Sequence, residues 1–421
     1  MTRSRLFQLV IGFVLIAALM AGCQKPGDAT QGSAPQTPAA DAPAPAPNAP
    51  GPNSGAAEPA PAPSGPENGA GSAQKPPSAV KMDAVTAVRL ADPLSGWIGG
   101  NGWIARTEDG GKTWSPQYSG SGTVRQLFAL NGQEAWATIA ADGASESDKA
   151  GDRRLLATKD GGNTWTAAGT VPNGGFLHFV SPSEAFSANA KTTDGGRTWT
   201  QLPVPDQTVG DAYFHDAKNG WAVTQQKDTI SVKRTTDGGE SWQTVMSKKT
   251  VAMLTGTVIR SAGADDAWVL LVGESGMTQT SYSLFHTQDG GKTWQTVLAN
   301  STAGGGPAPG FPIDHSEGPK NGGSKPGALY VVSPNVAFMG GQCMACDKPN
   351  TIGLTTDGGK TWVNREPAYA GYGEQRLAFA DAKHGWWILT DNAEPAVMYT
   401  TADGGVSWTK VHTFEKPKPS S

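Results

Sequence analysis

The sequence has few of the residues that carry redox and metal chemistry. It contains three cysteines and six histidines among 421 residues, and the histidines show no metal-ligand spacing. Its formal net charge of −4 gives no basic excess for contact with nucleic acid. These shortages point away from a metalloprotein and from a nucleic-acid-binding protein, so we expect no cofactor and no bound metal.

Long apolar runs are also missing, apart from one near the N-terminus. The apolar residues 6–21 follow two arginines and end just before Cys23. The run is short for a bilayer core of about 30 Å, and its layout is typical of a secretory signal. It resembles a bacterial lipoprotein signal. That resemblance implies a signal peptide over 1–22, lipidation of Cys23, and a place in the periplasm or on the outer side of the cytoplasmic membrane.

Aromatic residues are absent from residues 24–79, which are rich in proline and alanine. Such a segment cannot bury enough apolar surface to offset the entropy of ordering it. We therefore expect a disordered, semi-extended tether over 23–80. A folded domain over 81–415 and a short tail over 416–421 are expected to follow.

One octet, Thr-x-Asp-Gly-Gly-x-Thr/Ser-Trp, occurs seven times in the rest of the chain. The copies are residues 107–114, 158–165, 192–199, 235–242, 287–294, 355–362 and 401–408. Upstream of each copy stands a small residue followed by a large aromatic one, as in Gly220-Trp221. Short apolar stretches with turn residues between them, and no helical period, predict four strands per unit. The sequence therefore predicts an all-β fold, a single seven-bladed β-propeller of four-stranded antiparallel blades.

The octet resembles the Asp-box, or bacterial neuraminidase repeat, which is specific for propeller architecture and not for function. Together with the Gly-Trp strand it resembles the photosystem II assembly and stability factor family, over roughly residues 84–414. This resemblance implies a non-catalytic assembly or scaffold factor. A shared fold does not by itself carry a function, because propellers host many.

The aspartate of the octet is expected to be structural, since seven equivalent side chains around a ring cannot all serve one active site. The glycines supply positive φ, and the carboxylate can accept hydrogen bonds from the turn's own backbone. The seven aspartates are Asp109, Asp160, Asp194, Asp237, Asp289, Asp357 and Asp403.

Several inner-strand residues, which line the channel of a propeller, are polar. Four arginines on inner strands of an acidic protein predict a basic pocket for a carboxylate or an acidic partner segment. A hydrated channel without a ligand is the alternative. The candidate ligand-binding residues are Arg89, Arg125, His178, Asp211, Arg260 and Arg376.

Cys343 and Cys346 form a Cys-x-x-Cys pair in a long loop of the sixth unit. No thioredoxin-like context surrounds them, and a zinc site would need two more ligands. A local disulfide is the interpretation we favour. The longest loops and the connection 300–327 are predicted to lie on one face, where we place the binding surface.

We therefore expect a monomeric, non-catalytic extracytoplasmic lipoprotein that binds a membrane or extracytoplasmic protein. A cell-wall or glycan-binding module is the first alternative, with Tyr369 and Tyr372 as candidate exposed aromatics. A sialidase-like glycosidase is the second. Tyr213 or Tyr330 could serve there as the nucleophile, but the Arg-Ile-Pro signature of sialidases is absent.

Overall fold

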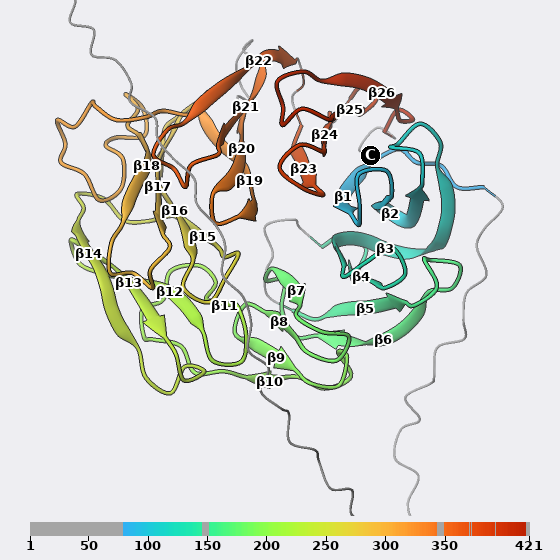
Figure 1. Cartoon of the computed structure of the whole chain (residues 1–421), viewed down its shortest axis with the longest axis horizontal. Coiled ribbons are helices and arrows are strands. Elements are labelled where there is room, and N and C mark those ends of the chain that lie inside the picture. The colour runs from blue at the N-terminus through green and yellow to red at the C-terminus, as the bar shows by residue number, and fades with distance from the viewer. Residues whose placement is uncertain are drawn as a thin grey trace, which may run out of the picture. The chain divides into compact units, whose positions relative to one another are not determined.

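The computed structural model describes residues 79–144, 151–342, 349–369, 371, 373–391 and 393–417. In these ranges every regular element is a β-strand, and antiparallel sheets follow one another around a ring (Figure 1). No helix in this part of the chain is long and apolar enough to cross a membrane. Cys23, nearly all of the expected tether, Cys343 and Cys346 lie outside the described residues. The fold is an all-β propeller.

The prediction of seven four-stranded blades is wrong, because the described residues form six sheets. Five have four strands, and the first has six. The six strands of that sheet are β1 (Val85–Leu90), β2 (Gly96–Thr107), β3 (Ser115–Ala129), β4 (Ala135–Ala140), β5 (Arg153–Thr158) and β6 (Thr166–Val171). The reason is the length of β3. Its Thr123 pairs with Asn101 of β2 and also with Ala140 of β4, so hydrogen bonding runs without a break through the first two repeats.

The other five sheets each contain one octet. Their strands are β7 (Leu177–Phe179), β8 (Ala185–Ser187), β9 (Ala190–Thr192) and β10 (Thr200–Gln201); β11 (Tyr213–Phe214), β12 (Gly220–Gln226), β13 (Thr229–Thr235) and β14 (Gln243–Lys249); β15 (Gly256–Arg260), β16 (Ala267–Ser275), β17 (Thr280–Thr287) and β18 (Gln295–Asn300); β19 (Lys325–Ser333), β20 (Val336–Gln342), β21 (Asn350–Thr355) and β22 (Val363–Tyr369); β23 (Gln375–Phe379), β24 (Gly385–Leu389), β25 (Val397–Thr401) and β26 (Thr409–Thr413). In each, the first strand lies nearest the middle of the ring (Figure 1). Each octet forms the turn before the last strand of its unit.

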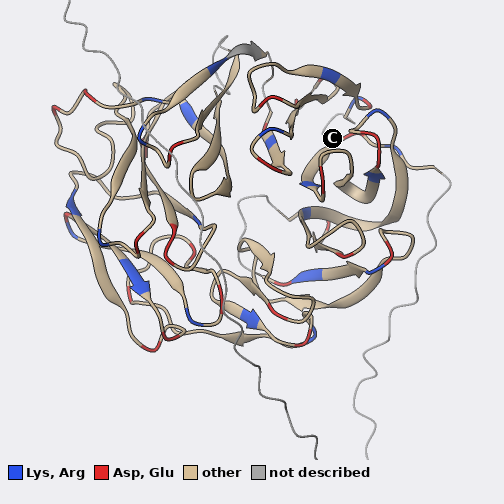
Figure 2. Cartoon of the chain, viewed as in Figure 1, with Lys and Arg blue, Asp and Glu red and all other residues tan. Residues whose placement is uncertain are grey.

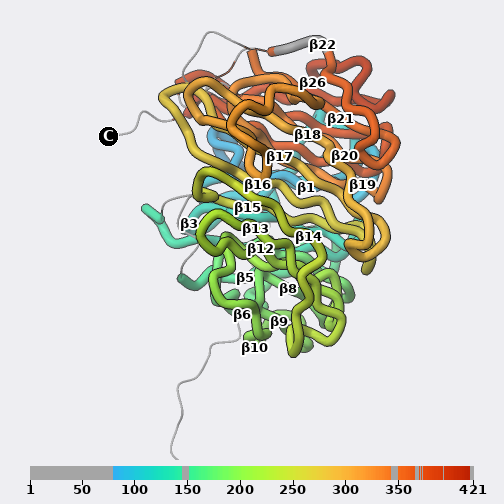
Figure 3. Tube along the Cα trace, turned by 90° about the vertical axis from the view of Figure 1, so that its left-hand side faces the viewer, coloured from blue at the N-terminus to red at the C-terminus, as the bar shows by residue number. Residues whose placement is uncertain are grey.

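The aromatic residue of each small-aromatic pair is a core anchor. All seven are at most 2% exposed: Trp97, Trp136, Phe186, Trp221, Trp268, Phe338 and Trp386. Each ring buries on the order of 150–250 Å². The sheets stack side by side (Figure 3), and these rings are buried in the clusters that join neighbouring repeats.

The ring closes mainly by packing between its first and last sheets. Trp103 of β2, Trp386 of β24 and Phe414 belong to one buried cluster. A single backbone hydrogen bond, from Glu415 N to Met82 O at 3.1 Å, joins the segment after β26 to the segment before β1. The residues just before β1 therefore add no strand to the last sheet.

Candidate functional site

The seven octets have the same internal hydrogen bonds. In the fifth copy, the Thr287 hydroxyl donates to Asp289 Oδ1 at 2.9 Å, and Gly291 N donates to that hydroxyl at 2.9 Å. The Thr293 backbone N–H and hydroxyl donate to Asp289 Oδ1 and Oδ2 at 2.9 and 2.6 Å. Both carboxylate oxygens are thus used inside the turn, and no other partner is needed to satisfy them.

The two glycines of each octet are required by backbone conformation. All fourteen have φ between +70° and +97°, where a Cβ is strongly disfavoured. The second glycine also touches the preceding sheet: a Cβ on Gly291 would lie 2.6 Å from Val245 Cβ. The octet therefore fixes its own turn and the spacing between sheets.

Hydrogen bonding lowers the pKa of the octet aspartates. The Thr293 hydroxyl is the largest cause for Asp289, and its pKa falls to about 2. The Thr198 hydroxyl has the same effect on Asp194, again to about 2. A carboxyl group with such a pKa stays ionised at neutral pH, so it cannot act as a general acid there.

A cavity of about 370 Å³ lies among the innermost strands of the ring. Its lining includes all six candidates from the sequence: Arg89, Arg125, His178, Asp211, Arg260 and Arg376. These come from the first sheet and from the sheets that begin with β7, β11, β15 and β23. The structure therefore brings the six side chains to one place, and binding of a ligand there remains a prediction.

Two of the arginines lie against aromatic rings. The guanidinium carbon of Arg260 is 3.7 Å from the centre of the Phe176 ring, and that of Arg89 is 4.5 Å from the centre of Phe128. Arg89 Nη1 also donates to the Tyr330 hydroxyl at 3.4 Å. Burial lowers the pKa of Arg260 to about 10, which keeps it cationic at neutral pH.

His178 is buried in the same wall, with 8% of its surface exposed. Its ring stacks on Tyr213, 5.0 Å between centres, and neither ring nitrogen makes a side-chain or backbone hydrogen bond of standard geometry. Burial lowers the pKa of His178 to about 4, so the imidazole is neutral at pH 7. The positive charge of the cavity comes from the arginines alone, set against the carboxylate of Asp211.

The two tyrosines considered as nucleophiles are engaged elsewhere. Tyr213 donates to the Ser261 carbonyl at 3.3 Å, and Tyr330 donates to the Phe379 carbonyl at 3.0 Å. Burial raises the pKa of Tyr213 to about 12, which disfavours the phenolate. Neither hydroxyl is arranged for covalent catalysis.

Much of this lining comes from one position of the inner strands, the residue paired with the core aromatic of the next strand, which the sequence patterns above did not single out. On the inner strands, the residue paired with each core aromatic is Arg89, Phe128, His178, Tyr213, Arg260, Tyr330 and Ala378 in turn. Each stands eight places before its aromatic in the sequence. This constant offset is a signal that an alignment of the repeats contains.

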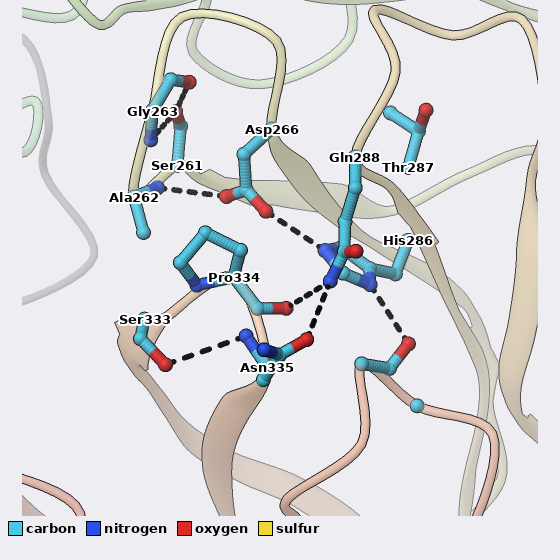
Figure 4. Close-up of polar contacts among 12 residues, drawn as sticks. Ser261, Ala262, Gly263, Asp266, His286, Thr287, Gln288, Ser333, Pro334 and Asn335 are labelled. Carbon is cyan, nitrogen blue, oxygen red and sulfur yellow. Dashed lines mark hydrogen bonds and ion pairs between the residues drawn. The ribbon is translucent and has the colours of Figure 1, made fainter. Parts of the chain in front are cut away.

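A buried polar cluster outside the cavity was also missed (Figure 4). His286 of β17 stacks on Trp268 at 3.7 Å, with Nε2 2.8 Å from Asp266 Oδ1 and Nδ1 2.8 Å from the Gly358 carbonyl. Gly358 belongs to the octet of the next sheet. The equivalent residues Arg106 and Arg234 also donate to the first glycine of the following octet. His286 thus occupies the position that Arg106 and Arg234 occupy in other repeats, where a side chain links one repeat to the next.

Part of the predicted loop face is packed against the sheets, and its role in binding stays a prediction. The connection between β18 and β19 packs onto the sheet, since Ser283 Oγ donates to the Pro309 carbonyl at 2.6 Å. Tyr369 is half-buried and stacks on Tyr399 at 3.9 Å, so it is no open platform for a sugar. Tyr372 lies outside the described residues. Among the described residues, no group of three or more His, Cys, Asp and Glu side chains is placed to hold a metal ion.

Comparison with known proteins agrees with a propeller. The sequence pattern of the family described as "Sortilin, neurotensin receptor 3" matches residues 188–304, less than half of the chain. A xyloglucanase from a Paenibacillus species is 24% identical over 351 residues, which cover 74% of this chain. The chain spans about 30% of the length of that curated relative.

Several solved structures are similar at low identity. "YCF48 bound to D1 peptide" is 14% identical, with 82% of this chain and 85% of that chain covered and a TM-score of 0.33. YCF48 from Cyanidioschyzon merolae is 14% identical, with coverage of 80% and 88% and a TM-score of 0.34. The Niastella koreensis GH74 enzyme is 14% identical, with coverage of 79% and 66% and a TM-score of 0.35. Likenesses of this degree carry no argument about activity or partner.

Proposed function

We propose that the chain is a non-catalytic binding protein whose propeller holds an acidic segment of a partner protein in the arginine-lined cavity. It would act as an assembly or scaffold factor similar to the photosystem II assembly factors. Lipidated Cys23 and the tether over 23–80 would anchor it on the outer side of the membrane. The observation that carries the proposal is the gathering of four guanidinium groups and one carboxylate in a single cavity.

The chemistry of the lining favours a carboxylate ligand. A guanidinium group presents a planar fork of donors that matches a carboxylate, and stacking on a ring orients the fork beforehand. Arg260 on Phe176 and Arg89 on Phe128 both have this support. Leu127, Leu329 and other aliphatic residues complete the wall. The cavity therefore suits an acidic side chain with apolar neighbours.

The same lining gives little support to hydrolysis of a glycoside. Most glycosidases use two carboxyl groups, one on either side of the scissile bond. Among the described residues that line the cavity, Asp211 is the one carboxylate. The surface charge elsewhere is mixed, with acidic and basic residues interspersed around the ring (Figure 2). The cavity is therefore the place where one sign of charge is concentrated.

Peptide binding tests the proposal directly. The full chain is titrated with a fluorescent Leu-Glu-Leu-Glu-Leu peptide, and separately with the same peptide carrying glutamine in place of glutamate. We expect binding of the acidic peptide only, weakened at least about tenfold by Arg260→Gln or Arg89→Gln and unchanged by Arg197→Gln at an exposed octet position. Equal binding of the two peptides, or equal effects of all three substitutions, would refute an arginine-lined site. Cross-linking in native membranes, followed by capture of the tagged chain, then identifies the natural partner.

A further inference from the structure

The second sheet, which is formed by the third repeat, is too short to cover its neighbour. Strands β8 and β9 have three residues each and β10 has two, whereas β12 and β13 of the next sheet have seven each. At about 3.3 Å per residue, that is roughly 10 Å of strand beside roughly 23 Å. Part of the neighbouring hairpin therefore has no sheet packed against it.

The uncovered face can be identified from the packing. Val223 and Val232 of the β12–β13 hairpin lie in one buried cluster with Ile259 of the following sheet. Ala222 lies on the opposite face and is buried with Phe186 of the second sheet. Side chains alternate along a strand, so every second residue from Ala222 onward faces the short sheet.

Beyond Ala222 these residues are all polar. On the Ala222 face, β12 carries Thr224 and Gln226, which pair with Ser231 and Thr229 of β13. Lys233, opposite Ala222, completes the row. Together with residues 205–207 and the hairpin turn at 227–228, they line a cavity of about 510 Å³, which we call the polar trough. Its volume falls within the roughly 300–1,000 Å³ of small-ligand sites.

The walls of the trough are fixed before any ligand binds. Among the described residues, three that are not glycine have positive φ, and Gln207 and Lys227 are two of them. Such a conformation costs roughly 1–2 kcal/mol per residue, so neighbouring contacts must hold it. The buried Gln225 does so: its backbone N–H donates to the Gln207 carbonyl and its side-chain amide to the Lys227 carbonyl, at 3.3 and 3.2 Å.

The chemistry of the lining selects a ligand class. Hydroxyl and carboxamide groups offer both donors and acceptors, no aromatic ring is present, and Pro205 is the one apolar residue. Asp228 is paired with Lys249 at 2.8 Å, and Lys233 Nζ donates to the Thr244 hydroxyl at 2.6 Å, which leaves its positive charge uncompensated. The remaining charges of the lining are Lys227, Lys233 and Asp206. We propose that the polar trough binds a saccharide that carries a carboxylate, such as a chain of uronic acid units. This site is separate from the arginine-lined cavity and does not depend on its function.

Calorimetric titration of the full chain with tetragalacturonate tests the proposal, with neutral maltotetraose and tetraglutamate as comparison ligands. We expect tetragalacturonate to bind at least about tenfold more tightly than either. Lys233→Met should weaken that binding about tenfold or more, Gln226→Ala should weaken it about threefold, and Ser231→Tyr should abolish it by filling the trough. Lys410→Met, at an exposed position on β26, is the matched control and should have no effect.

Three results would overturn the proposal. These are no binding of tetragalacturonate at millimolar concentration, equal binding of maltotetraose or tetraglutamate, and binding that Lys233→Met and Gln226→Ala leave unchanged. Thermal unfolding of each variant shows whether the fold is intact. Gln226 is exposed, so its substitution keeps the test valid if Ser231→Tyr does not fold. Arg260→Gln should leave saccharide binding intact, which separates this site from the peptide site.

Discussion

Replacing His286 by leucine should destabilise the propeller much more than the matching change in another repeat. His286 and Asp266 are 2% and 3% exposed, so the pair is out of reach of water (Figure 4). Both ring nitrogens face oxygen atoms, of Asp266 and of the Gly358 carbonyl. Because a carbonyl oxygen can only accept, Nδ1 donates to Gly358, and Nε2 shares a hydrogen bond with the Asp266 carboxyl group.

The expected cost follows from the partner that is left behind. Leucine removes both hydrogen bonds and leaves the Asp266 carboxylate buried with one donor, Ala262 N, at 2.7 Å. Leaving a buried polar group without its partner typically costs about 1–3 kcal/mol, and more for a charged group. Lys191→Leu is the matched control. It removes the partially exposed pair with Glu184, which is worth roughly 0–1 kcal/mol.

Equilibrium urea unfolding, followed by tryptophan fluorescence, measures both variants at pH 7. His286→Arg should retain most of the stability, because Arg106 and Arg234 make the corresponding bond in other repeats and lie over Trp97 and Trp221. If His286→Leu costs no more than Lys191→Leu, the buried pair contributes nothing. If arginine costs as much as leucine, His286 is not a substitute for the cation of the other repeats.

Two further predictions concern the octets. Gly291→Ala should lower the free energy of unfolding in urea by more than about 2 kcal/mol, because it combines a positive φ with a Cβ that meets Val245. Gly256→Ala is the control: its Cβ would have nothing within 4 Å, so stability should change by less than about 1 kcal/mol. A large loss from Gly256→Ala would show that contact is not the cause. The octet aspartates should also make the free energy of unfolding depend on pH. The pKa of Asp289 and of Asp194 is about 2 in the folded protein, below the ordinary 3.8. Their contribution to stability is therefore complete above about pH 4 and is lost as the pH falls toward 2. Thermal unfolding between pH 2 and 6 measures this, and Asp289→Asn should flatten the dependence; a melting temperature that does not change below pH 4 would contradict it.

The sequence predicted the strands and turns well, because the signals are local. An Asp-Gly-Gly turn needs positive φ at both glycines, and an aromatic ring after a small residue needs burial. The number of sheets could not be predicted the same way. Whether β3 stops or continues between Ser119 and Thr123 depends on pairing with two strands at once, Asn101 on one side and Ala140 on the other. No pattern within the Ser-Gly-Ser-Gly segment reports that pairing.

The cavity was predictable in part. Charged residues on inner strands indicated its lining, but the stacking of Arg260 on Phe176 needs contact across sheets, which spacing alone does not give. Two features of the sequence point to the polar trough. The third repeat is the shortest, and Thr, Gln, Thr, Ser and Lys alternate along the hairpin of the fourth. Its meaning depends on the two lying side by side, which only the fold shows.

The positions where the repeats agree and the positions where they differ have opposite uses. The octet aspartates and glycines agree in every repeat, and their hydrogen bonds are satisfied within the turn, so they have nothing to offer a ligand. The position opposite each core aromatic differs between neighbouring repeats, and the side chains there are arginine, phenylalanine, histidine, tyrosine or alanine. If every repeat had the same residue at that position, the channel lining would be symmetric. The observed variation instead concentrates positive charge at Arg89 and Arg260 and aromatic surface between them, so binding should be sought where the repeats differ.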